Sequence, residues 1–343
     1  MNPGFIASQI KRVNRNYLIT ALILLLLGGA LLAVSARELF NVLAGPAAID
    51  RASLLNLTKP GDLWRYNVTF TADKNVDSGV TQVTTTSRGG VTTGSRTSAY
   101  YRALLIEDKI IVAKMPDQNA STIVRGALVA IPKDVQTEII DDAIASTPTL
   151  KGRFLPYMLD AVDFGKSAVI LGIGILVLLG AGLFMAFQFA RRAFAGENHP
   201  ILTALAKYGQ PQFVRTAIDA TIPEGAKTRG AGFLASNVML FPSTYGMATF
   251  GVSDLVWAYR LNTRRNGVTT ITLQMADKDG KQRATPALSD ATATSMLKTL
   301  AETAPWMVVG YSAELEKSWK TNKQAFIQAV QDRRAAMQSQ PNR

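Results

Sequence analysis

Few residues in this chain have types and spacings that could carry out chemistry. The sequence holds no cysteine and one histidine, His199, which excludes disulfides, thiolate metal sites and cysteine nucleophiles and leaves little acid–base chemistry near neutral pH. His199 stands in the turn-like stretch GENHP, and no set of partner residues accompanies it in the sequence. We therefore expect His199 to have a structural role at the start of a helix.

Three further patterns approach catalytic motifs and fail. The tripeptide GKS at Gly165–Ser167 matches the end of a phosphate-binding loop, but Asp160 occupies the position of the first glycine of that motif. The letters GYSAE approach a nucleophile elbow, but Glu314 replaces the second glycine. Asp141 and Asp142 are neighbours on a predicted helix, so they point in different directions and cannot close one site alone. The sequence thus predicts a protein without catalytic residues, metal or cofactor.

Two long uncharged segments predict membrane spans. The segment NYLITALILLLLGGALLAVSA is long enough, as a helix, to cover the roughly 30 Å hydrocarbon core of a bilayer, and so is SAVILGIGILVLLGAGLFMAFQFA. We predict transmembrane helices at residues 17–36 and 167–190. A cleaved signal peptide is the alternative for the first segment, because VSA has the spacing that signal peptidase reads. Its apolar core, however, is longer than the usual 7–15 residues or so.

The distribution of positive charge predicts an orientation. The net charge of +12 divides into about +3 for the residues before the first span, about +1 between the spans and about +8 after the second. By the positive-inside rule both termini lie in the cytoplasm, where the basic excess faces anionic lipid and requires no nucleic acid. The predicted parts are a tail at 1–16, an extracytoplasmic β-rich domain at 37–165, a cytoplasmic domain at 196–311 and an amphipathic helix at 312–343.

Small residues at four-residue spacing predict where the spans approach another helix. The candidates are Gly29 and Ala33 in the first span and Ala168, Gly172, Gly182 and Ala186 in the second. Packing of the two spans against each other, contacts with a second copy and contacts with other membrane proteins all remain open. Neither span contains an ionisable residue, so we expect no ion path within one protomer.

Alternating apolar and polar residues dominate the region between the spans. The stretch YYRALLIEDKIIVAKMP predicts two strands about a turn at Glu107–Lys109, and KDVQTEIIDDAIAS predicts a short helix starting near Asp134. A stretch rich in Thr, Ser and Gly predicts a long hairpin with its tip around Arg88–Gly90. The region is similar to a small OB-type barrel, so we expect a β-barrel-like (OB-like) domain with one helix.

The region after the second span carries two hairpin signals, Asn266-Gly267 and Asp279-Gly280, which predict an antiparallel meander with one buried side. A helix follows in SDATATSMLKTLAETAP, and Ser312 is placed to cap a long terminal helix. The apolar stripe of that terminal helix is Leu315, Trp319, Phe326, Val330 and Met337.

The order of these elements carries a family resemblance. The stretches VSDLVWAYRLNTRRNG, TTITLQMADKDGK and ATATSMLKTLAETAPWMVVGYS resemble bacterial membrane-anchored proteins with a pleckstrin-homology-like (PH-like) domain, many of them uncharacterised. The resemblance implies a PH-like cytoplasmic domain and a bacterial inner membrane. In lipid-binding members, basic residues in a strand-connecting loop bind phosphates. The candidate lipid- or partner-binding residues here are Arg264, Arg265, Lys278, Lys281 and Arg283.

The sequence therefore predicts an α+β membrane protein with two transmembrane helices and a folded domain on each side of the membrane. The function that we expect is a non-enzymatic docking scaffold or a subunit of a larger membrane assembly. Its expected partners are membrane lipids and either other membrane proteins or a second copy. Two alternatives remain open. One is a sensor of anionic lipid headgroups, and the other is an extracytoplasmic carboxylate enzyme, which would need a buried carboxylate pair roughly 5–9 Å apart.

Overall fold

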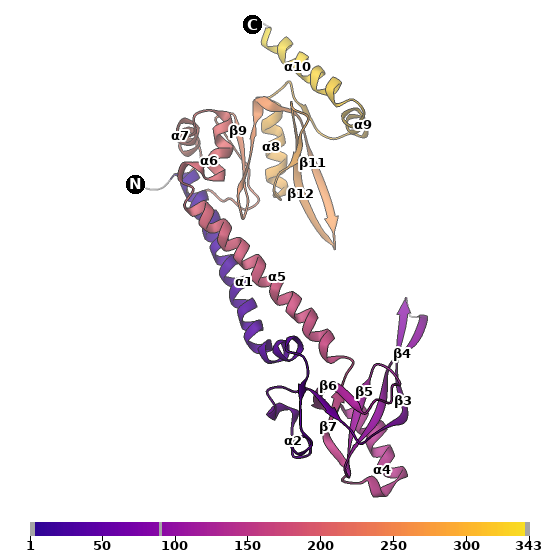
Figure 1. The fold of residues 1–343 in the computed structure, drawn as a ribbon. Helices are drawn as coiled ribbons and strands as arrows, with labels where there is room; N and C mark the ends of the chain where they lie inside the picture. The colour runs from indigo at the N-terminus through magenta and orange to yellow at the C-terminus, as the bar shows by residue number, and fades with distance from the viewer. Residues whose placement is uncertain (1–3, 89–90, 340–343) are drawn as a thin grey trace. The chain divides into compact units, whose positions relative to one another are not determined.

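A computed structural model describes residues 4–88 and 91–339 (Figure 1). The chain forms two compact units: unit 1 comprises Met1–Ile23 and Gly182–Arg343, and unit 2 comprises Leu24–Ala181. The boundary falls within two long helices, α1 (Phe5–Leu43) and α5 (Phe164–Ala193). Both are long and apolar enough to cross a membrane, and only 17% of the most apolar stretch of each is buried. Such exposed apolar helices are expected to contact lipid or other helices.

Unit 2 is built on a seven-stranded sheet with the order β1-β2-β6-β7-β5-β4-β3. The strands are β1 (Ala47–Ala48), β2 (Asn67–Thr71), β3 (Lys74–Arg88), β4 (Val91–Ile106), β5 (Lys109–Met115), β6 (Ile123–Ala130) and β7 (Phe154–Asp160). Within the described residues the sheet stays open, so the expected closed barrel is wrong. A barrel needs its two edge strands to pair along their length, and β1 has only two residues to offer.

Both faces of this sheet are covered. One face packs with α2 (Arg51–Leu55) through Leu54, and the other packs with a helical segment formed by α3 (Lys133–Val135), η2 (Gln136–Asp141) and α4 (Asp142–Ser146). Two short 3-10 turns, η1 (Pro60–Asp62) and η3 (Pro148–Leu150), complete the unit. The predicted turn between the two strands is confirmed, since β4 ends at Ile106 and β5 begins at Lys109. The predicted hairpin tip lies at residues outside the described part.

Unit 1 contains two further sheets, with the orders β10-β9-β8 and β13-β12-β11-β14. Their strands are β8 (Phe233–Ala235), β9 (Val238–Pro242), β10 (Met247–Gly251), β11 (Leu255–Arg265), β12 (Val268–Asp277), β13 (Gln282–Ala284) and β14 (Val308–Val309). The helical elements are η4 (Gly196–Asn198), α6 (Pro200–Leu205), η5 (Ala206–Tyr208), α7 (Pro211–Thr221), η6 (Val252–Asp254), α8 (Asp290–Thr303), α9 (Ala313–Thr321) and α10 (Lys323–Ser339). Both sheets and α8 contribute to one core, which includes Phe241, Leu273 and Leu300.

The start of α1 is part of unit 1. Phe5, Ile6 and Val13 are fully buried, and they pack with residues of α6, α7, β8 and β9. The segment predicted as a tail is therefore helical from Phe5 and belongs to a core. The reason is its apolar stripe, which continues N-terminally past the charged Lys11, Arg12 and Arg15 and finds a buried partner.

The meander β11–β12–β13 has the two predicted turns, but it is buried on both sides and not on one. Ala258 and Leu273 face α8, whereas Trp257 and Tyr259 pack against α9 and α10. The ring of Trp257 lies 5.9 Å from that of Trp319, measured between centroids. The second face is covered because the apolar stripe of the C-terminal segment needs a partner surface.

The C-terminal segment forms two helices where one long helix was expected. Ser312 caps α9 as predicted, with its hydroxyl accepting from the backbone N–H of Leu315. Asn322 then ends α9 and accepts from the N–H of Ala325 in the first turn of α10. The break lets Trp319 and Phe326 meet edge to face at 5.4 Å. Met337, the last residue of the predicted stripe, is 40% exposed.

Candidate functional site

The predicted basic residues of the first turn lie at the end of the long β11–β12 hairpin. Arg264 pairs with Thr269 and Arg265 with Val268 in the strand register, directly before the Asn266-Gly267 turn. Both arginines are exposed, and neither has an ion-pair partner within the described residues. They form a solvated basic tip of the hairpin.

The basic residues of the second turn are matched by acidic neighbours. Lys278 pairs with Asp254 at 2.7 Å, and this hydrogen-bonded ion pair raises the pKa of the lysine. Arg283 lies 3.5 Å from Asp277, and its guanidinium also covers the ring of Phe250. Lys281 and Arg283 line a cavity of about 200 Å³ that Asp254, Asp277 and Asp279 line as well. This mixed charge makes the cavity a poor site for an anion.

A larger cavity in unit 1 has an unmatched positive charge. It has a volume of about 540 Å³, and we call it the arginine pocket. Its lining residues are Arg12, Asn16, Thr228, Arg229, Gly230, Pro242, Ser243, Thr244, Pro286, Ala287, Leu288 and Ser289. These residues of the described chain include two arginines and four hydroxyl side chains, and no carboxylate. Guanidinium groups and hydroxyls are the donors with which proteins bind phosphate and carboxylate groups.

Arg12 comes from α1, a little more than one helical turn before the apolar stretch begins. Its guanidinium donates to the hydroxyl of Thr228 and to the carbonyl of Ser243, the latter at 3.3 Å, while its Nε is buried without a partner. Burial, followed by repulsion from Arg15, lowers the pKa of Arg12. Because Arg12 has no carboxylate partner among the described residues, an anion in the pocket would compensate its charge.

The loop between β9 and β10 forms one wall of the pocket and is fixed against the two long helices. Asn16 of α1 donates to the carbonyl of Thr244 at 2.8 Å. Tyr245 shares a 2.8 Å hydrogen bond with Thr20, and Arg192 of α5 donates to its carbonyl at 3.1 Å. These contacts hold Ser243 and Thr244 beside Arg12 and therefore position the wall of the pocket.

The start of α8 also lines the pocket. Ser289 caps this helix by accepting from the N–H of Thr292, and its own N–H donates to the carbonyl of Gly230 at 3.1 Å. Gly230 has a φ of +68°, a left-handed conformation that suits glycine. Asp290 follows at the first position of α8, but its carboxylate is paired with Arg260. The acid nearest to this wall in sequence is therefore already matched.

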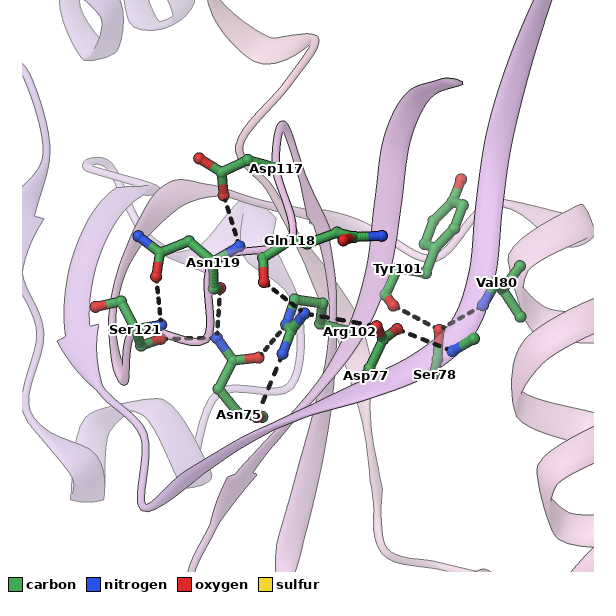
Figure 2. Close-up of polar contacts among 11 residues, drawn as sticks. Asn75, Asp77, Ser78, Val80, Tyr101, Arg102, Asp117, Gln118, Asn119 and Ser121 are labelled. Atoms are coloured by element: carbon green, nitrogen blue, oxygen red, sulfur yellow. Dashed lines mark hydrogen bonds and ion pairs between the residues drawn. The ribbon is translucent and has the colours of Figure 1, made fainter. Parts of the chain in front are cut away.

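Unit 2 holds a buried arginine, Arg102, and each of its three guanidinium nitrogens donates to the protein (Figure 2). Its Nε donates to the amide oxygen of Asn75 at 2.5 Å, and its Nη1 donates to the carbonyl of Gln118 at 3.2 Å. Asp77 lies 3.9 Å from the same nitrogen, and Asn75 donates in turn to the carbonyl of Ser121 at 2.7 Å. Arg102 thus connects the β5–β6 loop to β3, which is a structural role.

The small residues predicted for helix packing have different environments. In unit 2, Ala168 is fully buried, and a Cβ on Gly172 would lie 3.3 Å from Leu39 of α1. On α1 the close approach is made by Gly28, where a Cβ would lie 2.8 Å from Leu179, whereas Gly29 faces open space. Ala33 is exposed. In unit 1, Gly182 is buried and Ala186 is half-buried.

His199 has the predicted helix-start role. It is 1% exposed, its Nδ1 accepts from the N–H of Ile201 at the start of α6, and its Nε2 lies 3.3 Å from the side-chain oxygen of Asn14. Burial, followed by repulsion from Arg192, lowers its pKa, which favours the neutral ring. This arrangement is structural.

In the part of the chain that the structure describes, the acidic residues are dispersed. Among the residues that the structure describes, no group of three or more His, Asp or Glu side chains is placed to hold a metal ion. In the described part of unit 2 no Asp or Glu is buried, so the carboxylate-enzyme hypothesis lacks the pair that would support it.

Comparison with protein families gives one match. Residues 226–319 match a family described as a domain of unknown function (DUF6709). Searches of curated proteins and of solved structures gave no match. The matched segment includes Thr228, Arg229, Ser243 and Ser289 of the arginine pocket, whereas Arg12 and Asn16 come from α1 outside it. Sequence reasoning missed this pocket because it counted Arg12 only as a charge near a membrane span.

Proposed function

We propose that this is a two-span membrane protein that binds an anionic group, a phosphate of a lipid headgroup in particular, in the arginine pocket. The observation that carries the proposal is the charge of the pocket: Arg12 and Arg229 line it, and none of the described residues that line it is acidic. The proposal develops the headgroup-sensor alternative and moves its site from the β-turns to the start of α1.

The position of Arg12 supports a ligand from the membrane. Arg12 precedes the predicted start of the first span, at residue 17, by five residues, or about 7.5 Å along a helix. A span that crosses the bilayer there would put the pocket beside the lipid headgroups. Anionic lipids attract basic groups near the surface with about 1 kcal/mol for each Lys or Arg. The volume of about 540 Å³ leaves room for a headgroup around the phosphate.

The fold of unit 1 fits the PH-like part of this proposal. Two three-stranded meanders, β8–β9–β10 and β11–β12–β13, are followed by α8, which shares a core with both sheets. A cytoplasmic location of unit 1 in a bacterial inner membrane is consistent with its basic excess. A docking scaffold or assembly subunit stays a prediction, and mass spectrometry of the intact complex after mild extraction would test it.

The test compares two double substitutions of equal charge in the full chain, reconstituted in zwitterionic nanodiscs with or without anionic phospholipid. Arg12→Gln/Arg229→Gln removes the charge of the pocket, and the matched control Arg264→Gln/Arg265→Gln removes the charge of the exposed hairpin tip. Retention of anionic lipid is measured by native mass spectrometry, and binding of inorganic phosphate is measured separately to distinguish a headgroup from a free anion.

We expect the pocket variant to lose about 100-fold in affinity for the anionic lipid, because two charge-assisted hydrogen bonds at about 1.5 kcal/mol each amount to about 3 kcal/mol. The control variant should lose less than about threefold. Equal losses in the two variants would mean general surface attraction and would contradict a pocket. The single variant Arg229→Gln changes an exposed residue and keeps the hydrogen bonds of Arg12, so it tests the pocket if the double variant does not fold.

A further inference from the structure

The end of α1 in unit 2 is bonded to the segment that precedes β2. Asn41 is fully buried, and its amide donates to the carbonyls of Arg37 and Trp64 at 2.8 and 2.9 Å. Its side-chain oxygen accepts from the N–H groups of Tyr66 and Asn67 at 2.9 and 3.1 Å. One side chain therefore fixes the backbone of residues 64–67 to the last turns of the helix.

The same segment is also held by the start of α5. The ring of Tyr66 lies under the guanidinium of Arg37, 4.8 Å from its centroid, and meets the ring of Phe164 edge on at 5.3 Å. Arg37 donates in addition to the carbonyls of Pro60 and Leu63. Residues 63–67 are thus attached to the ends of both long helices and cannot move independently of them.

Trp64 is the exception in this bonded segment, because its side chain is 63% exposed. No hydrogen bond of its indole occurs within the described residues. Phe40 and Leu43, in the last turns of α1, are also exposed, at 45% and 85%. A large amphipathic ring that is exposed on a fixed backbone indicates an interaction surface.

The position of the Trp64 segment relative to the ends of the predicted spans indicates what its ring contacts. The uncharged stretch of α1 ends directly before Arg37, and Asn41 follows one turn later, about 6 Å along the axis. On α5, Phe164 precedes the uncharged stretch by a few residues. Both attachments therefore lie where the predicted spans leave the hydrocarbon core, the level at which tryptophan rings are enriched in membrane proteins.

We propose that Trp64, together with Phe40 and Leu43 of the last turns of α1, is an anchor that inserts into the membrane interface and contacts lipid. The inference is independent of the arginine pocket, and it requires that α1 and α5 cross a bilayer. Because Asn41 and Tyr66 fix the segment to both helices, the anchor would set the depth and tilt of the seven-stranded sheet relative to the membrane.

The absence of cysteine from the sequence permits a direct test with single spin labels. The full chain carrying Trp64→Cys, labelled and placed in zwitterionic vesicles, is compared with a chain carrying Ile123→Cys. Ile123 is a matched control because its side chain is 60% exposed, close to the exposure of Trp64. It pairs with Thr71, which lies at the far end of β2, about 13 Å along the strand from Asn67. Collision of each label with oxygen, which enriches in lipid, and with a water-soluble nickel chelate is measured by electron paramagnetic resonance.

We expect the label at position 64 to collide with oxygen several-fold more, relative to the nickel chelate, than the label at position 123. A label at 64 that meets the nickel chelate as readily as the control would overturn the proposal. A label protected from both reagents would also overturn it, because the ring would then be buried against protein. If Trp64→Cys misfolds, the unlabelled protein can be tested by tryptophan fluorescence in brominated lipid. We expect the brominated lipid to quench part of the tryptophan emission, and we expect that quenched part to be absent in Trp64→Phe. An unchanged quenched fraction would count against lipid contact.

Discussion

Asn41→Ala gives the sharpest test of how unit 2 is attached to α1. The substitution removes four hydrogen bonds of the side chain, two as donor and two as acceptor, and leaves the carbonyl of Trp64 and the N–H groups of Tyr66 and Asn67 without their partner in a partly buried place. Three of these bonds reach residues 64–67, and the fourth, to the carbonyl of Arg37, lies within α1. At about 1 kcal/mol for each of the three, the loss amounts to about 3 kcal/mol, which corresponds to about a 150-fold rise in the opening equilibrium of this segment.

Hydrogen–deuterium exchange of the full chain in nanodiscs measures that opening directly. We expect peptides that cover residues 60–70 to lose most of their protection in Asn41→Ala, while peptides from unit 1 keep theirs. Asn262→Ala is the control, because this exposed asparagine accepts a single bond, from Arg260. If the protection factors of residues 66 and 67 decrease by less than about tenfold, the attachment depends on other contacts and the reasoning is refuted.

Two further substitutions test unit 1. Because the pKa of buried His199 is lowered, the unfolded state binds a proton that the folded state does not, and the free energy of unfolding falls as the pH drops below about 6.5; it is unaffected above that value. Thermal unfolding between pH 5 and 8 should show this fall in the unaltered protein and a smaller one in His199→Asn, which keeps a side-chain acceptor for the N–H of Ile201. Trp319→Ala removes a 4% exposed ring from the cluster with Trp257 and should cost about 3–5 kcal/mol by denaturant unfolding, whereas Trp319→Phe should cost less. A loss under about 1 kcal/mol for the alanine variant would mean that α9 does not pack on the sheet.

Local patterns allowed much of the fold to be predicted from the sequence. Asn266-Gly267 has positive φ at both residues, as a two-residue hairpin requires, and Ser312 caps its helix through its own hydroxyl. These features depend on neighbours in sequence, so the pattern contains what determines them. The break at Asn322 was missed because a continuous apolar stripe can also be divided between two helices that pack on one surface.

Features that join distant segments could not be predicted in the same way. Alternation in unit 2 indicates strands but not their order, and the order leaves β1 and β3 as separate edges where a barrel would have paired them. The turn residues Arg264 and Lys278 were selected by charge alone. Whether such a residue has an acidic neighbour depends on tertiary contacts such as that between Lys278 and Asp254.

The arginine pocket shows why the start of α1 matters to any function of unit 1. Arg12 and Arg229 are 217 positions apart in sequence, yet they line one cavity. They do so because Phe5 and Val13 of α1 pack in one core with residues of α6, α7, β8 and β9. The segment that matches the domain of unknown function supplies Arg229 and the hydroxyls but not Arg12. That segment alone would present an incomplete site with half of its positive charge. The helix α1, which is long and apolar enough to cross a membrane, is thus part of the proposed binding site, so ligand binding has to be tested in the full chain.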